Sequence, residues 1–286
     1  MLCIATFFVT FDCMPKKGPI GFFDSGYGGL TVLNEVRAVL PDYDYLYLGD
    51  NARAPYGTRS FEVVYEYTWQ CVKRLFNEGC ELVIVACNTA SAKALRSIQQ
   101  NELLDYPGRR VLGVIRPSAE TVGELSKLKE IVVLATQGTV QSNSYALEFK
   151  KFSPSTLIHQ YACPMWVPLV ESGEFNTKEG QSILKRDLND VKIKFPSADV
   201  YLLGCTHYPI LFKNIQRFTS DDVLIVSQGP IVAESLKKYL SRHSWLVKRL
   251  STGGRIKYLT TEESQVFKDS VANIFGIQLS VEHIKI

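Results

Sequence analysis

Two short apolar runs that each end at a cysteine set the strongest limit on the architecture. Val83–Ala86 lead without a polar interruption to Cys87, and the largely apolar run Val200–Gly204 leads in the same way to Cys205. Runs of this length are typical of strands that are buried on both faces, as in parallel sheets. Each cysteine is followed within two residues by a threonine and then by a segment that favours a helix. The pattern therefore predicts two strand–cysteine–helix units.

Both cysteines are expected at the carboxyl end of a strand, just before a helix N-terminus. Open α/β sheets bind ligands at that edge. The free N–H groups and partial positive charge of a helix N-terminus favour an anion and lower the pKa of a thiol. A single cysteine in such a place is most often a small buried apolar residue. Two cysteines in matching settings, each beside hydroxyl or amide side chains, instead indicate a functional pair.

The rest of the chain alternates the same two kinds of segment. Strands are expected at residues 19–23, 45–49, 83–86, 111–115, 131–135, 156–161, 200–204 and 223–226. Helices are expected at residues 30–40, 60–78, 90–96, 140–151, 177–195, 231–242 and 262–275. This alternation predicts an α/β fold with two pseudo-symmetric, doubly wound domains and mainly parallel sheets.

A length of 286 residues fits two domains of ordinary size. We place the crossing between them at Arg116-Pro117, where proline interrupts the strand pattern. The first domain then combines residues 19–115 with residues 226–286, and the second spans residues 116–225. The tail is expected to pack back on the first domain, and the active site is expected in the cleft between the two.

The first residues are treated separately. We expect residues 1–18 to lie outside the fold as an N-terminal extension, because the first strand begins near Pro19. Leu2–Phe11 are mostly apolar, but no Lys or Arg precedes them and no small-residue cleavage site follows, so the pattern does not favour a signal peptide. Met14 has the sequence context of a natural start, so residues 1–13 are interpreted as an upstream extension.

Composition excludes several classes of function. Hydrophobic residues make up 46% of the chain and charged residues 21%, as in soluble globular enzymes. A net charge of +3 is too small to indicate a nucleic-acid-binding protein. The seven cysteines are scattered without a CxxC pair, which argues against a disulfide framework or a zinc ribbon and for a reducing compartment. No apolar run is long enough for a transmembrane helix, so a membrane partner is not expected.

A glycine-rich turn, Asp24–Gly29, follows the first expected strand. Its glycines stand at positions 26, 28 and 29, whereas a dinucleotide-binding GxGxxG beginning at Gly26 would need its third glycine at Thr31. Asp24 also places negative charge where a pyrophosphate would lie. A carboxylate at that edge suits an ammonium group or a proton-transfer partner better than a dinucleotide.

Two thiols that face each other across a cleft can invert a carbon centre without an organic cofactor. One thiolate removes a proton from one face of the carbon, and the opposite thiol donates a proton to the other face. A thiol pKa near ~8.5 lets one partner be ionised and the other neutral. His207 can hold or polarise the proton of Cys205, and Asp24 can do the same for Cys87. Carboxylate binding is assigned to helix N-termini and to the hydroxyl and amide side chains of Asn88, Thr89 and Thr206.

At these residues the chain resembles the glutamate racemases of the aspartate/glutamate racemase family. The resemblance runs in order from about residue 19 to the end, and its specificity comes from the combination of motifs. They are Gly21–Gly26 with Gly28–Leu30, Gly49-Asp50 with Pro55–Gly57, Ala86–Ser91, Leu134–Thr136 with Gly138-Thr139, Cys163-Pro164 with Glu171, and Leu203–Pro209.

The resemblance implies a cofactor-independent, two-base racemase without a metal. Cys87 and Cys205 would be the catalytic pair, with Asp24 and His207 as their proton-transfer partners. The residues implied to line the substrate site are Asp24, Ser25, Tyr56, Gly57, Asn88, Thr89, Thr139, Thr206 and His207. The family supplies D-glutamate for bacterial peptidoglycan in the cytoplasm, and homodimers are common in it.

The sequence departs from the family pattern at three places. Ser118 stands where the family often has glycine, and Met165-Trp166 form a variable pair. Ser227–Gly229 read Ser-Gln-Gly where many members have Asp-Ser-Gly. These differences remove no proposed catalytic group. They leave the position of the hinge between the domains undetermined from the sequence.

Three other readings remain. An aspartate racemase or another member of the superfamily is the nearest, although His207 favours glutamate because relatives with aspartate specificity tend to carry Glu there. A Cys–His acyl-transfer hydrolase would use Cys205 as nucleophile and His207 as base, which leaves Cys87 without a role. A non-catalytic amino-acid-binding protein would not require two thiols.

Overall fold

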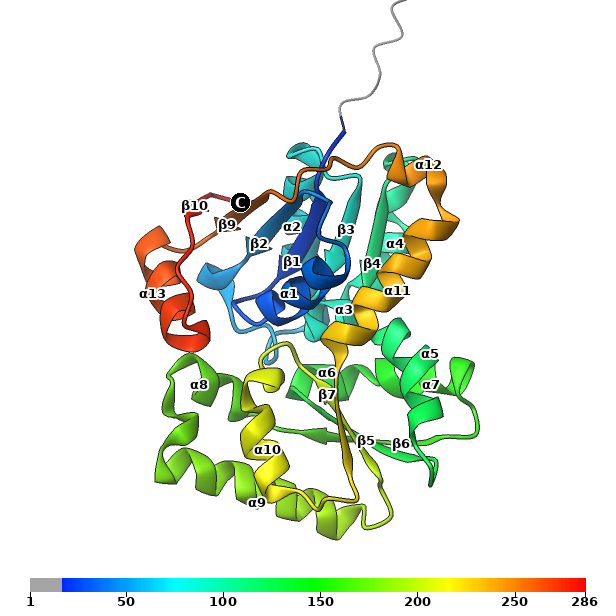
Figure 1. Cartoon of the computed structure of the whole chain (residues 1–286), viewed down its shortest axis with the longest axis vertical. Coiled ribbons are helices and arrows are strands. Elements are labelled where there is room, and N and C mark those ends of the chain that lie inside the picture. Colours follow the sequence, from blue (N-terminus) through cyan, green and yellow to red (C-terminus); the bar gives the residue numbers. More distant parts are fainter. Residues whose placement is uncertain (1–16) are drawn as a thin grey trace, which may run out of the picture.

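The structure, a computed structural model, describes residues 17–286. It consists of two parallel sheets, one in each of two units that lie end to end (Figure 1). The six-stranded sheet has the spatial order β10 (Val281–His283), β9 (Ile256–Thr260), β2 (Tyr45–Gly49), β1 (Ile20–Asp24), β3 (Leu82–Val85) and β4 (Arg110–Gly113). The four-stranded sheet has the order β6 (Leu157–Ala162), β5 (Glu130–Ala135), β7 (Val200–Gly204) and β8 (Leu224–Ser227).

All pairings between these strands are parallel, which confirms the predicted α/β class. The order β2-β1-β3-β4 in one sheet matches the order β6-β5-β7-β8 in the other. The two units are therefore pseudo-symmetric over four strands, and β9 and β10 extend only the first. β9 pairs with β2, so this part of the tail lies on the six-stranded sheet.

Alternating side chains along each strand bring apolar residues to both faces of each sheet. In β1, Ile20 and Phe22 face one layer of helices and Phe23 faces the other. On the six-stranded sheet one layer holds α1 (Gly29–Val39), α11 (Gln228–Arg242) and α13 (Ser264–Phe275), and the other holds α2 (Phe61–Asn77), α3 (Asn88–Lys93) and α4 (Leu95–Gln100).

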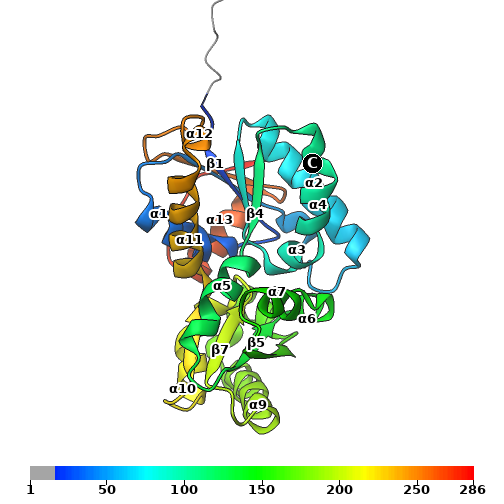
Figure 2. The same ribbon diagram turned by 90° about the vertical axis from the view of Figure 1, so that its right-hand side faces the viewer.

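The four-stranded sheet is covered in the same way. One layer consists of α5 (Ile115–Leu125) and α7 (Ser144–Phe152), and the other of α8 (Trp166–Glu171), α9 (Lys178–Lys194) and α10 (Phe212–Phe218). Both units are thus doubly wound, as predicted. The two remaining α-helices are α6 (Gln137–Ser142), at the junction of the units (Figure 2), and α12 (Ser244–Val247).

The chain crosses between the units twice, from β4 into α5 and from β8 into α11. The strand expected at residues 111–115 is wrong beyond Gly113, because α5 begins at Ile115. Arg116-Pro117 lie in its first turn, where a proline removes no helical hydrogen bond. The boundary expected between residues 225 and 226 falls inside β8, so the second crossing comes after Ser227.

Gly18, near the start of the described residues, is hydrogen-bonded into the fold. Its N–H donates to the carbonyl of Arg249 at 3.0 Å, and its carbonyl accepts from the N–H of Ser251 at 2.8 Å. The expectation that residues 1–18 lie outside the fold is therefore wrong for Gly18, which these two bonds anchor. Residues 1–16 of that expected extension lie outside the described residues. Within residues 17–286 no helix has the length and apolar character needed to cross a bilayer.

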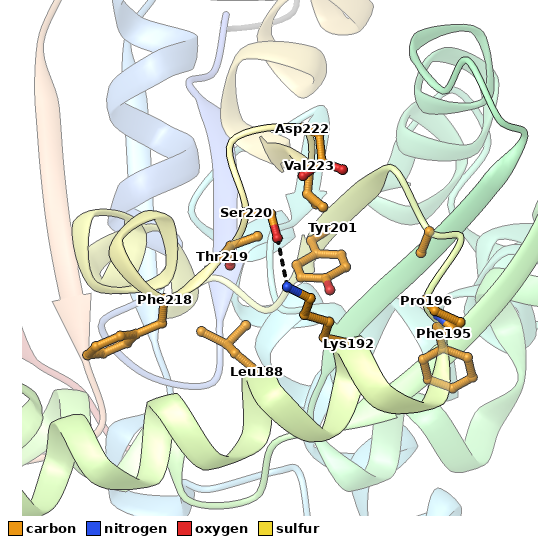
Figure 3. Close-up of a pocket in the computed structure, with 11 residues that line it drawn as sticks. Leu188, Lys192, Phe195, Pro196, Tyr201, Phe218, Thr219, Ser220, Asp222 and Val223 are labelled. Carbon is orange, nitrogen blue, oxygen red and sulfur yellow. Dashed lines mark hydrogen bonds between the residues drawn. The ribbon is translucent and has the colours of Figure 1, made fainter.

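A small cavity of about 60 Å³ lies in the four-stranded unit (Figure 3). It is lined by Tyr201 and Lys192 among others, and the Lys192 ammonium donates to Ser220 Oγ at 3.2 Å. Tyr201 is near the start of β7, whereas Cys205 follows the end of that strand. The cavity is therefore at the opposite end of the sheet from the cysteine and is not part of the site described next.

Candidate active site

The carboxyl ends of both sheets meet at the junction of the units. In the six-stranded sheet, β1 ends at Asp24 and β3 leads to Cys87, and in the other sheet β7 leads to Cys205. Hydrogen bonds cross the junction directly, since Thr206 Oγ1 donates to Asp24 Oδ2 at 3.2 Å. Figure 2 shows α3 of the first unit next to α6 and α7 of the second. The predicted pair of strand-end cysteines therefore lies where the two units meet.

Cys87 caps the N-terminus of α3. Its Sγ accepts from the N–H of Ala90 at 3.4 Å and shares a hydrogen bond with Ser25 Oγ at 3.3 Å. Burial raises the pKa of the Cys87 thiol to about 12, and the negative charge of Asp24 adds to this effect. The lowering expected from the helix N-terminus is therefore outweighed by desolvation. Without a substrate, Cys87 is a neutral thiol at neutral pH.

Cys205 has a different neighbour. Its Sγ lies 3.9 Å from Nδ1 of His207, and Nε2 of the same ring lies 3.1 Å from Oε1 of Glu171. Burial by itself would lower the pKa of His207, but the hydrogen bonds to Cys205 and Glu171 outweigh it and raise the pKa to about 10. The His207 ring thus lies between the Cys205 sulfur and a carboxylate, and its raised pKa favours the protonated form of the ring. This arrangement stabilises negative charge on the Cys205 side of the junction, and it is the contact that the two-residue spacing predicts.

Asp24 is fully buried and connects the two units. Its Oδ1 accepts from the N–H of Gly26 at 2.9 Å, and its Oδ2 accepts from Thr206. Burial raises the pKa of the Asp24 carboxyl, against the opposing effect of the positive charge on His207. The expected proton partnership between Asp24 and Cys87 is not a hydrogen bond in this structure. Ser25 is the hydrogen-bond partner of Cys87, and Asp24 acts on that thiol through its charge.

Gly28 lets the glycine-rich turn approach the other unit closely. A methyl group at this position would lie 2.4 Å from Thr206 Oγ1 and 2.6 Å from Nδ1 of His207. Both distances are well inside van der Waals contact. The glycine pattern that resembles a dinucleotide loop therefore serves close packing of the turn against the Cys205 segment.

Three threonines form a hydroxyl cluster across the junction. Thr89 Oγ1 lies 2.9 Å from Thr136 Oγ1 and 3.3 Å from Thr139 Oγ1, and the latter two lie 3.1 Å apart. Thr89 belongs to α3, whereas Thr136 caps α6 and Thr139 belongs to that helix. Gly57 packs on the same cluster, since an added methyl group there would lie 3.2 Å from Thr136 Cβ. The structure thus brings Thr89, Thr139 and Gly57, which the sequence assigns to the substrate site, into contact with Thr136.

Two of the predicted substrate-site residues use their polar groups in hydrogen bonds within the protein. The Tyr56 hydroxyl donates to the buried carboxylate of Asp50, so it is not directed at either thiol. The Asn88 amide is held by Gln228 and by Tyr145, at 2.8 Å and 2.6 Å respectively. Asn88 remains adjacent to Cys87 in the chain, and its orientation is held by Gln228 at the start of α11 and by Tyr145 of the other unit.

Sequence reasoning assigned no role to Glu171 or Gln228. Glu171 was part of the motif that carries the family resemblance, and its place at the end of α8 brings its carboxylate to His207. Gln228 belongs to Ser227–Gly229, one of the three places where the sequence departs from the family pattern. Residues 17–286 contain no group of three or more His, Cys, Asp or Glu side chains arranged to hold a metal ion.

Comparisons with known proteins identify the family. A family model described as Asp/Glu/Hydantoin racemase matches residues 31–235. The chain is 38% identical to a glutamate racemase of Listeria monocytogenes over 273 residues, which cover 94% of this chain and 99% of the relative.

Two solved structures that resemble this chain are also glutamate racemases. A glutamate racemase from Bacillus anthracis has a TM-score of 0.85 and 33% identity, with 94% of this chain and 98% of that chain covered. A glutamate racemase from Francisella tularensis, solved in complex with D-glutamate, has a TM-score of 0.82 and 28% identity, with 94% and 98% covered. The chain therefore belongs to the Asp/Glu/Hydantoin racemase family.

Proposed function

We propose that the protein is a cofactor-independent glutamate racemase that interconverts L- and D-glutamate by proton transfer at Cα. The observation that carries this proposal is the pair of strand-end thiols, one from each pseudo-symmetric unit, at a common junction. Each thiol has its own polar partner, Ser25 for Cys87 and His207 for Cys205. Two acid–base groups delivered from opposite units are what inversion of a carbon centre requires.

In the proposed reaction one cysteine, as thiolate, takes the proton from Cα and becomes a thiol. The electron pair left on Cα is shared with the adjacent carboxylate, and the opposite thiol then gives its proton to the other face of Cα and becomes a thiolate. The roles of the two sulfurs are exchanged at the end of the turnover, so the reaction runs in both directions. No electron leaves the system and no co-reactant is needed.

The surroundings of the thiols suit a zwitterionic amino acid. The buried carboxylate of Asp24 is a partner for the substrate ammonium group, and that positive charge would offset the burial that raises the pKa of Cys87. The imidazolium of His207 stabilises the thiolate of Cys205. The hydroxyl cluster around Thr89 and the helix N-termini of α3 and α6 are donors for the substrate carboxylates.

The substrate must enter by a movement of the units. Cys87 and Cys205 are only 5% and 6% exposed, and Asp24 is fully buried. Free glutamate therefore reaches the thiols when the two units separate, and the closed arrangement excludes water from the reacting carbon. We place the pivot at the two chain crossings.

The biological setting follows from the family resemblance. We propose that the protein supplies D-glutamate for peptidoglycan synthesis in the cytoplasm and that it forms a homodimer. The domains are proposed to be the six-stranded and four-stranded units, with the reaction at their junction.

Circular dichroism of amino acids incubated with the purified protein tests the proposal. L-Glutamate should lose its signal as it approaches a racemic mixture, and L-aspartate should keep its signal. Racemisation of aspartate at a comparable rate would move the assignment to the broader superfamily. Retention of both signals, together with hydrolysis of an activated ester through Cys205, would favour the acyl-transfer reading instead.

A further inference from the structure

Asn88 is held by a closed ring of three hydrogen bonds that spans both units. Asn88 Nδ2 donates to Gln228 Oε1 at 2.8 Å, and Gln228 Nε2 donates to the Tyr145 hydroxyl at 2.8 Å. The Tyr145 hydroxyl donates in turn to Asn88 Oδ1 at 2.6 Å. Asn88 is 3% exposed, Gln228 is 4% exposed and Tyr145 is fully buried. Each member donates to the next, so the bonds polarise one another in the same sense.

Gln228 fixes the direction of this ring. Its Nε2 also faces the Val114 carbonyl at 3.2 Å and Ser118 Oγ at 2.7 Å. The Val114 carbonyl cannot donate, and the Ser118 hydroxyl already donates to it at 2.9 Å. The amide nitrogen must therefore lie on that side, which leaves Oε1 to face Asn88. It follows that the Asn88 amide has only one orientation, with Nδ2 toward Gln228 and Oδ1 toward Tyr145.

The orientation of Asn88 leaves one donor free. Its Nδ2 carries two N–H groups, of which one is used by Gln228 and the other has no acceptor among residues 17–286. Asn88 follows Cys87 directly and is the first residue of α3. The free N–H therefore belongs to the helical turn whose N-terminus the Cys87 thiol caps. A flipped amide would offer an oxygen in its place and would repel a carboxylate.

Gln228 also connects the two chain crossings. Val114 and Ser118 belong to the crossing from β4 into α5, and Gln228 is the first residue of α11, directly after β8. The Gln228 side chain thus connects, by hydrogen bonds, the crossing from β4 into α5, the crossing from β8 into α11 and the segment next to Cys87. The Tyr145 hydroxyl can either donate or accept, so it does not select the direction of the amide by itself. It holds the orientation that Gln228 selects by donating to Asn88 Oδ1.

We propose that Gln228 is a positioning residue that orients the Asn88 amide so that its free N–H binds a carboxylate of the substrate. This inference rests on the proposed racemase function. Asn88 contributes to binding in the ground state and in the transition state alike, so loss of its orientation raises KM more than it changes kcat.

The test replaces Gln228 with methionine, which has a similar length and no hydrogen-bonding amide. KM for L-glutamate and D-glutamate should rise about tenfold, as for the loss of one buried hydrogen bond, while kcat changes less than about threefold. Calorimetric Kd values for glutamate should rise in parallel. A purely structural role would lower the fraction of folded protein, which reduces apparent kcat and leaves KM and Kd unchanged; that result would overturn the proposal.

The test includes a matched control variant, Gln99→Met, and an alternative variant, Tyr145→Phe. Gln99→Met removes a comparable bond, from Gln99 Nε2 to the Val111 carbonyl at 2.7 Å, away from the thiols, and KM should stay within about twofold of wild type. If Gln228→Met does not fold, Tyr145→Phe removes the hydroxyl that closes the ring and should raise KM in the same direction. An unchanged KM in Tyr145→Phe would then reject the proposal.

A double-mutant cycle with Asn88→Ala shows whether Gln228 acts through Asn88. On that background Gln228→Met should change KM by less than about twofold, because the amide it orients is gone. A full, additive increase would contradict the inference. A wild-type protein that binds glutamate but does not racemise it would count against the proposed function only, since the Kd comparison would still stand.

Discussion

The two cysteine segments share a backbone plan and differ in their chemistry. Cys87 and Cys205 each follow the third strand of the same four-strand order. Around Cys87 lie a hydroxyl, a backbone N–H and a nearby carboxylate, and its pKa is raised. Around Cys205 lies an imidazole ring that is itself paired with Glu171. The repeated fold therefore supplies the geometry, whereas the polar partners of the two sulfurs differ.

This difference matters for a reaction that must run in both directions. Two sulfurs in identical surroundings would be equally able to remove the Cα proton. Here burial and Asp24 favour the neutral thiol of Cys87, whereas the raised pKa of His207 favours negative charge near that ring. The substrate ammonium group, placed beside Asp24, reduces that inequality. We infer that binding of the amino acid prepares the two sulfurs for their opposite roles.

The largest effect should come from removing either sulfur. Cys87→Ala and Cys205→Ala should each lower kcat by at least about 10²–10⁴-fold, because each removes the only acid–base group on one face of the substrate. Racemisation rates followed by circular dichroism give the measurement. Cys80→Ala is the control, since Cys80 is also a buried free cysteine but precedes β3 at the far end of the strand. Near-normal activity of either catalytic variant would remove the paired-thiol account.

A smaller effect is expected from the partner of Cys205. His207→Asn keeps a polar group near the sulfur but removes the positive charge, so kcat should fall by about 10²-fold. Glu171→Gln leaves the ring in place and weakens only its charge, so the loss should be nearer tenfold. If Glu171→Gln were the more damaging of the two, Glu171 would have a role of its own in the reaction.

Ser25→Ala removes the side-chain partner of Cys87, as His207→Asn changes the partner of Cys205. It removes the hydroxyl that bonds to Cys87 and leaves the N–H of Ala90 in place. The loss of one neutral hydrogen bond should lower kcat/KM by about tenfold or less. A loss equal to that of His207→Asn would mean that the two sulfurs depend on their partners equally, against the asymmetry seen here.

The last prediction of this comparison concerns the pH dependence of stability, not activity. The pKa of His207 is raised in the folded protein to about 10 from its ordinary value of 6.5, so protonation of this ring stabilises the fold. That contribution is complete below pH 6.5 and is lost as the pH rises toward 10. The groups that face the ring are Cys205, Glu171 and Asp24.

Urea unfolding at several pH values measures this contribution of His207 to the free energy of unfolding. The free energy of unfolding of the wild type should decline relative to that of His207→Asn over this interval. A constant difference between the two proteins would show that the ring is not protonated in the folded state.

Local patterns predicted much of the fold and the centre of the site. Strand-end cysteines, the glycine turn and the two-residue spacing of Cys205 and His207 are properties of short segments, and the structure brings them together. Pro117 was misread because the same residue ends a strand in one context and fits the first turn of a helix in another.

The ring around Asn88 could not be predicted in this way. Gln228 lies 140 positions from Asn88 in the chain, and only the packing of both crossings brings them into contact. Likewise, the raised pKa of Cys87 depends on how deeply the folded chain buries the thiol, which no local pattern contains.

Proton exchange in D₂O tests the paired-thiol mechanism most directly. L-Glutamate is incubated with wild-type protein, and the Cα positions of both enantiomers are examined after the first turnovers by mass spectrometry. The D-glutamate formed should carry deuterium at Cα, because its new proton comes from the solvent-exchanged opposite thiol, and the remaining L-glutamate should carry little. Retention of the original proton in a measurable fraction of the D-glutamate would show that a single base serves both faces, and would contradict the account.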